Sequence, residues 1–184
     1  MLDTYHQKYA NQPDEELQRR LDEKEDELRR VQAKLELRFK SEVLDIAVMG
    51  CGDVRFVEGH KSIFTRVFNK PVCINTFDIT TEHLDGAVGV YQHDCTLPLL
   101  FGPYDITFAH VLLRFIPKDK QWALIESSLS KLKPSGVAIH VLDPEDYQDT
   151  LNVDFPDLLK KAKAANVHYT LVDLSIGQAL VLTV

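Results

Sequence analysis

A glycine-rich turn follows the first strongly apolar run of the sequence, and its residue types suit contact with a ligand. Residues 44–56 read LDIAVMGCGDVRF, so an apolar run ends on Gly50, Cys51 and Gly52 and then becomes polar. Glycine lets the backbone approach a ligand without a Cβ clash, and the start of a following helix offers free N–H groups to an anionic group. Taken alone, such a turn is about as often a plain tight turn as a ligand site.

A carboxylate follows each of the next two apolar runs. Asp78 is the next-to-last residue of PVCINTFDI, where the predicted strand ends, and Asp94 is the last residue of GVYQHD. A carboxylate at the first position can accept hydrogen bonds from both hydroxyls of a ribose, and one at the second can accept from an adenine amino group. Each carboxylate could instead cap the segment that follows it, Thr80 and Thr81 after Asp78 and residues 96–101 after Asp94. Three consecutive strand ends with ligand-suited residues favour a nucleoside site.

These residues need a parallel sheet to bring them together, and the chain predicts one. Apolar runs alternate with helical patterns from residue 44 onward, as in 60–70, 118–132 and 154–166, which is typical of a mostly parallel sheet with helices on both faces. The last two runs, VHYTLVDLSI and QALVLTV, are too close for a parallel return and must pair as a hairpin. We therefore predict an α/β domain with a mostly parallel seven-stranded sheet and an antiparallel last strand.

An N-terminal helical extension over residues 1–43 precedes this domain, which we assign to residues 44–184. Residues 14–39 predict one long charged helix with an apolar stripe, in which Lys24 and Arg38 interrupt the second row. One interpretation is a helix that packs one edge on the domain, and we favour it. The other is a seam for self-association or for a protein partner. The apolar stripe consists of Leu17, Leu21, Leu28, Val31 and Leu35.

Composition excludes several classes of function. The net charge of −7 over 184 residues argues against a general nucleic-acid-binding surface. No signal peptide is visible at the start, and no apolar run approaches the roughly 20 residues of a membrane span. The three cysteines, Cys51, Cys73 and Cys95, are far apart and odd in number, a pattern that indicates reduced thiols in the cytoplasm rather than disulfides. His60, His83 and His93 lack the tight spacing of metal ligands, so we predict no metal site.

The order of these motifs resembles the class I S-adenosylmethionine-dependent methyltransferases, over residues 44–184. MGCGDV resembles the family's glycine-rich loop, TFDIT its ribose-binding motif and QHDCT its adenine-contacting motif, and the long segment 104–141 with its Lys-Pro-x-Gly turn is the closest match. The resemblance implies S-adenosyl-L-methionine as cofactor. It places Gly50, Cys51 and Gly52 at the methionine part, Asp78 at the ribose, Asp94 and Cys95 at the adenine, and Ala109 and His110 at the methyl donor.

The loop departs from the family pattern at two positions. The usual acid falls on Val48 and the third glycine on Val54, and Asp53 could supply a carboxylate only from another direction. Losing one charged hydrogen bond weakens binding by about ten- to a hundredfold, so we expect the loop to bind the cofactor more loosely. A second hypothesis is a catalytically degenerate relative that acts as a cofactor-binding or protein-interaction module.

Methyl transfer needs little covalent help from the protein, because alignment of donor and acceptor supplies much of the rate. Where an acceptor needs a general base, His110 is the first candidate, with His140 and Asp143 as alternatives. His110 could equally be a pocket-wall residue that does not titrate, and Arg114 could contact an acceptor or lie in water. The methyl acceptor is not predicted by the sequence.

Overall fold

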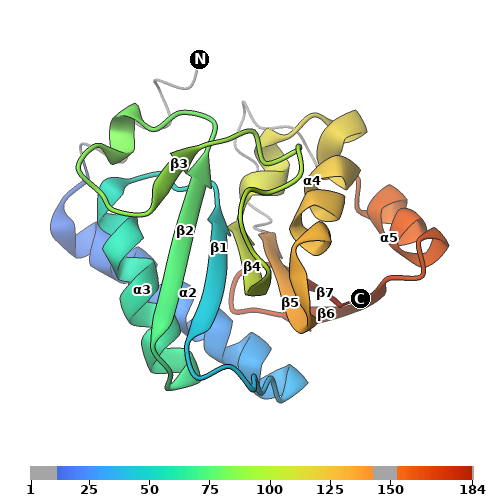
Figure 1. The fold of residues 1–184 in the computed structure, drawn as a ribbon, viewed down its shortest axis with the longest axis horizontal. Coiled ribbons are helices and arrows are strands. Elements are labelled where there is room, and N and C mark those ends of the chain that lie inside the picture. Colours follow the sequence, from blue (N-terminus) through green and yellow to red (C-terminus); the bar gives the residue numbers. More distant parts are fainter. Residues whose placement is uncertain (1–11, 143–152, 184) are drawn as a thin grey trace.

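The computed structural model describes residues 12–142 and 153–183, which form a sheet flanked by helices (Figure 1). The seven strands lie in the order β3-β2-β1-β4-β5-β7-β6. Strands β1 to β5 run parallel, and β7 runs antiparallel between β5 and β6. The predicted fold class is therefore confirmed, including the reversed last strand. The strands are β1 (Leu44–Met49), β2 (Val72–Asp78), β3 (Val90–Gln92), β4 (Tyr104–His110), β5 (Leu132–Leu142), β6 (His168–Asp173) and β7 (Gln178–Thr183).

The strand order reverses direction at β1, which has β2 on one side and β4 on the other. Met49 of β1 pairs with Phe77 of β2 and with Ala109 of β4, so the three strands end level with one another. In open α/β sheets such a switch point forms a crevice at the carboxyl ends of the strands. The glycine turn, Asp78 and His110 therefore meet at one edge of the sheet.

Helices cover both faces of the sheet and make two separate cores. On one face α2 (Asp14–Leu35) and α3 (Val54–Phe68) pack on residues of the central strands, and on the other face lie α4 (Lys118–Ser130) and α5 (Phe155–Ala164) (Figure 1). Ile46, Val48 and Phe108 point into the first core, whereas Ala47, Met49 and Ala109 point into the second. This alternation follows from the two-residue period of a strand.

Helix α2 packs its apolar stripe on the domain, as the favoured interpretation predicts. Leu17, Leu28 and Val31 are buried against the chain's own core, and Leu21 is partly buried there. The approach to α3 is close at Gly59, where an added Cβ would lie 2.4 Å from a methyl group of Leu21. A small residue at this point lets the two helices come together, so α2 is held beside α3 and the first strands.

The boundaries of three elements differ from the sequence-based expectation for local physical reasons. Helix α2 ends at Leu35 and not at 39, because Glu36 turns left-handed with φ 49° and its N–H returns to Gln32. Helix α3 begins at Val54, six residues earlier than expected, because the Asp53 side chain caps it. The expected turn at residues 133–136 instead belongs to β5, as an irregular stretch that shifts the β4–β5 register.

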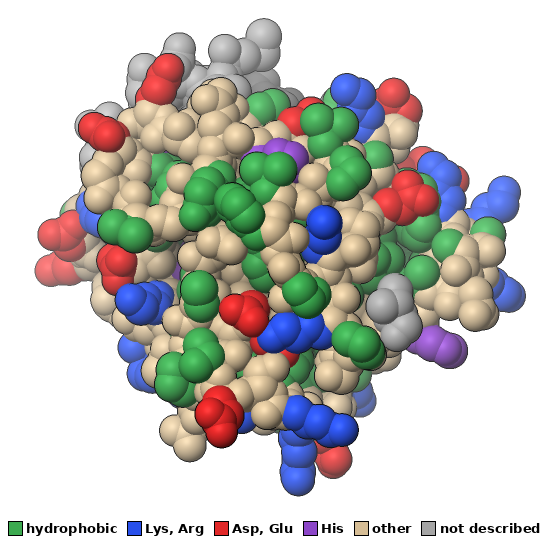
Figure 2. Space-filling model, viewed as in Figure 1, with side chains coloured by type: hydrophobic (Ala, Val, Ile, Leu, Met, Phe, Trp, Pro, Cys, Tyr) green, Lys and Arg blue, Asp and Glu red, His purple; other side chains and the backbone are tan. Residues whose placement is uncertain are grey.

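The surface carries no continuous apolar face in the view of Figure 2, where hydrophobic side chains form several small groups among charged and polar ones. Ile79, Leu97 and Phe115 are exposed large apolar residues in the connections between strands and helices. Within the described residues, no helix combines the length and apolarity that a membrane crossing requires.

Candidate functional site

The turn after β1 needs glycine at its first position. Gly50 has φ +75°, a left-handed conformation that side chains rarely adopt, and its N–H donates to the carbonyl of Phe77 at 2.8 Å. A Cβ here would lie 3.0 Å from a methyl group of Leu112, in the short η2 turn (Leu112–Phe115) that follows β4. The turn is thus closed against β2 and covered by the segment after β4.

Asp78 ties the glycine turn to the end of β2. Its side chain is 7% exposed, and one oxygen accepts from the N–H of Cys51 at 2.7 Å while the other accepts from Thr80 at 3.3 Å. His83 Nε2 lies 2.6 Å from the Cys51 carbonyl, so it must be the protonated ring nitrogen. A carboxylate has about four acceptor sites, and these two bonds leave Asp78 capacity for a ligand hydroxyl.

The third predicted position, at Asp94 and Cys95, lies beyond the last residue of β3. Asp94 accepts from the N–H and hydroxyl of Thr96, at 2.9 and 2.7 Å, so it caps the following turn as the alternative interpretation predicts. These bonds hold the pKa of Asp94 below its ordinary value. The thiol of Cys95 is buried near the carbonyl of Phe77 and interacts with the backbone of Gly50. Asp94 and Cys95 therefore border the same edge as the glycine turn.

Neither cysteine in this region is a nucleophile at neutral pH. Burial raises the pKa of Cys51 to about 12, and burial together with the charges of Asp78 and Asp94 raises that of Cys95 to about 12. A thiolate, not a thiol, attacks carbon or sulfur centres. Both side chains consequently act as small, neutral packing groups beside the turn.

The two valines in the loop occupy different environments. Val48 is 1% exposed within the core under α2 and α3, whereas Val54, the first residue of α3, is 36% exposed. Asp53 is engaged elsewhere, since it caps α3 through the N–H of Arg55 and pairs with the Arg55 guanidinium at 2.9 Å. Arg55 also pairs with Asp14 at the start of α2. The carboxylate of Asp53 thus fixes the start of α3 and links it to α2.

A buried polar cluster surrounds His110, and the sequence did not predict it. His110 Nε2 lies 3.0 Å from Glu27 Oε2, and Glu27, Lys24 and His60 are buried, at 7%, 7% and 3% exposure. Lys24 Nζ stands 5.4 Å from the ring centre of Phe56. Burial raises the pKa of Glu27 and lowers those of Lys24 and His60. The interruption of the apolar stripe at Lys24 was the one signal in the sequence.

The other residues named as a possible general base or acceptor contact are buried or fall outside the described residues. His140 is 1% exposed and bonds to the hydroxyl of Ser128 at 3.1 Å, and burial lowers its pKa to about 3. It therefore packs under α4, so it is a poor general base. Arg114 is buried and does not lie in water, and Asp143 falls outside the described residues. No group of metal-ligating side chains occurs within the described parts of the chain.

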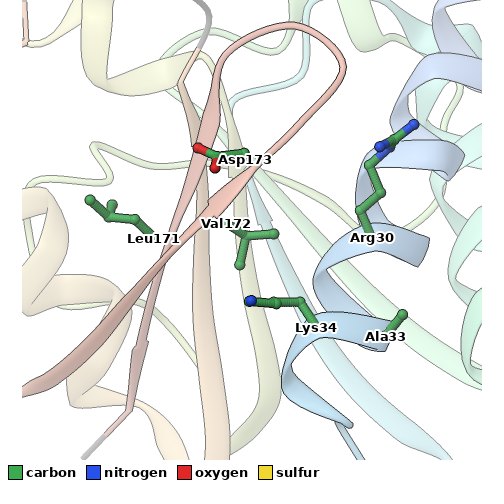
Figure 3. A pocket seen from close by; sticks show the side chains of 6 residues that line it. All are labelled: Arg30, Ala33, Lys34, Leu171, Val172 and Asp173. Atoms are coloured by element: carbon green, nitrogen blue, oxygen red, sulfur yellow. The ribbon is translucent and has the colours of Figure 1, made fainter.

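A pocket of about 390 Å³ lies between α2 and the edge strand β6, lined by Arg30, Ala33, Lys34, Leu171, Val172 and Asp173. Figure 3 shows Lys34 extending from α2 toward Val172, with Leu171 directed to the other side of the strand. Strand β6 is at the opposite edge of the sheet from β2 and β3. This pocket is therefore separate from the glycine turn and Asp78.

No protein family matches this sequence, and no curated protein does. Solved structures are similar to it in fold. An S-adenosylmethionine-dependent methyltransferase from Clostridium acetobutylicum has a TM-score of 0.68 at 11% identity, over 97% of this chain and 98% of its own. The complex of DhpI with SAH has a TM-score of 0.63 at 16% identity, over 98% and 93%.

A pericyclic reaction enzyme is similar to 84% of this chain, with a TM-score of 0.61 at 12% identity. This chain spans only 46% of the length of that enzyme. The fold of the chain is that of the class I S-adenosylmethionine-dependent methyltransferases, as the resemblance of its motifs predicts.

Proposed function

We propose that this chain is an S-adenosylmethionine-dependent methyltransferase. The observation that carries the proposal is the joint placement of the glycine turn and Asp78 at the switch point of the sheet, linked by the 2.7 Å hydrogen bond from Cys51 to Asp78. Similar structures are complexes with SAM or SAH by name. In the same arrangement, Asp78 accepts from the ribose hydroxyls, and the glycine turn lies against the methionine part.

The residues at this edge fit such a cofactor. Gly50 presents no side chain, and Asp78 has unused acceptor sites facing the same edge. The neutral thiols of Cys51 and Cys95 stand beside a site for a methyl donor without competing as methyl acceptors. Bound S-adenosylmethionine supplies an activated methyl group, and the protein supplies orientation and exclusion of water.

His110 is the candidate to take a proton from the methyl acceptor. It ends β4 at the switch point, and it contacts Glu27 through Nε2. An ionised Glu27 accepts from Nε2–H and so fixes the orientation of the imidazole ring at the end of β4. Acceptors that are already good nucleophiles need no such base, and His110 then orients the acceptor only.

The second candidate function is a degenerate relative that binds the cofactor without transferring its methyl group. The buried Val48 favours it, because no acid stands at that position to hold the turn and the ligand. Turnover with radiolabelled S-adenosylmethionine and a protein extract as acceptor source distinguishes a transferase from a binding module.

We place the protein in the cytoplasm on the strength of its three free cysteines.

We expect Asp78→Ala to weaken binding of S-adenosylhomocysteine by about tenfold or more, because an acceptor for the ribose hydroxyls and the anchor of Cys51 are both lost. Calorimetric titration measures it. Asp85→Ala is the matched control, since Asp85 is an exposed carboxylate in the connection after β2 and its removal should leave the affinity unchanged. Equal affinity in Asp78→Ala and the parent would exclude Asp78 from the site.

A further inference from the structure

Lys24 is a buried cation on α2 whose charge is incompletely compensated. Its side chain lies on the inner face of α2 at 7% exposure, and none of the described residues gives it a hydrogen bond or an ion pair. The ring centre of Phe56 lies 5.4 Å from Nζ. A buried ammonium costs folding free energy unless an anion or several acceptors complement it.

Glu27 is a buried carboxyl group that lies one helical turn from Lys24, and burial raises its pKa to about 7. Residues three apart on a helix share a face, and both Glu27 and Lys24 are 7% exposed as whole residues. Glu27 makes one hydrogen bond, to His110, and has acceptor sites left over. In the same cluster, both ring nitrogens of the buried His60 have no hydrogen-bond partner among the described residues. The cluster thus presents an ammonium and a carboxyl group on one face of α2, each with hydrogen-bonding capacity that the described residues do not use.

Both charges stand at the glycine turn. Lys24 Nζ lies over the ring of Phe56 in the first turn of α3, and Phe56 packs in one cluster with Cys51 of the glycine turn. Glu27 contacts His110 at the end of β4. The turn at Gly50 directly follows β1, which lies between β2 and β4. Its Gly50 N–H bonds to the Phe77 carbonyl of β2, and Met49 before it pairs with Ala109 of β4. A ligand end that carries one carboxylate and one ammonium on the same carbon complements such a pair.

We propose that α2 supplies the binding site for the α-amino acid end of the cofactor, with Lys24 holding the carboxylate and Glu27 the ammonium. This inference rests on the proposed function, because S-adenosylmethionine ends in an α-amino acid. This role would explain why Lys24 and Glu27 are buried although burial of charged groups costs folding free energy. Glu27 would also replace the carboxylate that the family pattern has at position 48, where this chain has Val48. Helix α2 is then part of the site and not only a support for it.

The test compares two ligands that share the nucleoside and the thioether. S-adenosylhomocysteine carries the amino acid end, and 5′-methylthioadenosine lacks it. We expect Lys24→Met and Glu27→Gln each to weaken binding of S-adenosylhomocysteine by about tenfold or more while 5′-methylthioadenosine binds as it does to the parent. Lys34→Met and Glu15→Gln are the controls, because both residues are exposed on the same helix, and neither ligand should respond.

Thermal melts without ligand separate a binding role from a structural one. Lys24→Met removes a buried ammonium and keeps the volume, and Glu27, whose pKa is raised by burial, can stay protonated in its absence. The melting temperature of the variant should therefore equal or exceed that of the parent. A lower melting temperature with equal losses for both ligands would show that the pair only supports the fold, and the inference would be wrong. Unchanged affinity for S-adenosylhomocysteine would overturn it as well, with the proposed function intact. A parent that binds neither ligand would overturn both.

Discussion

Asp105→Ala should cost about 3 kcal/mol of folding free energy, because it removes the centre of a buried ionic network. Asp105 is 2% exposed, and its carboxylate accepts from Ser41 Oγ at 2.6 Å, from Asp45 N at 2.8 Å and from Lys133 Nζ at 2.7 Å. Lys133 keeps a bond to Asp45, which places the cost at the lower end of the range for a broken buried pair. Urea denaturation measures the loss.

The control for this variant is Asp26→Ala, which removes an exposed ion pair to Arg30 and should change stability by about 0.5 kcal/mol or less. The network joins the amino ends of β1, β4 and β5, at the opposite edge from the glycine turn. Cofactor affinity should therefore be unchanged in Asp105→Ala. A stability loss as small as that of the control would contradict the buried network.

The same carboxylate makes stability depend on pH in the acid range. Burial acts to raise the pKa of Asp105, but hydrogen bonds from Lys133, Ser41 and Asp45 outweigh it and hold the pKa below its ordinary value. A lowered pKa adds stability above the unfolded-state value of about 3.9, and this stability is lost as the pH falls through the lower folded-state value. Asp105→Asn should accordingly flatten the decline in stability at acid pH.

Val48→Asp should destabilise the protein by about 3 kcal/mol or more, since it places an unpaired carboxylate in an apolar core. Val48 is 1% exposed and packs with Leu28 of α2 and Ile63 of α3 in the first core. The new carboxylate would also lie on the face of the sheet toward which α2 directs Glu27. Thermal melts in the presence and absence of S-adenosylhomocysteine measure the effect.

Val54→Asp is the matched control, because Val54 is exposed at the first position of α3, where a negative charge favours the helix dipole. We expect its stability to change by about 0.5 kcal/mol or less. If ligand restored Val48→Asp to the stability of the parent, position 48 would face the cofactor after all. The role proposed for Glu27 would then be superfluous.

The sequence was sufficient for the fold because its signals were local. Apolar runs of strand length, separated by helical patterns, determined the parallel sheet, and the short link around Gly177 forced the last hairpin. The predicted end of α2 and the predicted start of α3 were wrong, because a single residue decides each of them. Glu36 turns left-handed after α2, and the side chain of Asp53 caps α3. Such single-residue conformations leave no periodic signal.

The site was predictable only in part, for a different reason. Gly50, Asp78 and His110 follow directly from strand ends, which the topology brings to one edge. Lys24 and Glu27 lie on a highly charged helix, where charged residues usually face water, and the contact of Glu27 with His110 joins positions far apart in the chain. The docking of α2 beside Gly59 decides which of its charges are buried, and that is a tertiary effect.

The most direct test of the proposed function is a calorimetric titration of the parent protein with S-adenosylhomocysteine. A methyltransferase site at the glycine turn and Asp78 should give saturable binding of one ligand per chain, and Asp78→Ala should weaken that binding by about tenfold or more. Absence of binding by the parent at ligand concentrations up to about 1 mM, which limits any interaction to less than about 4 kcal/mol, would contradict it.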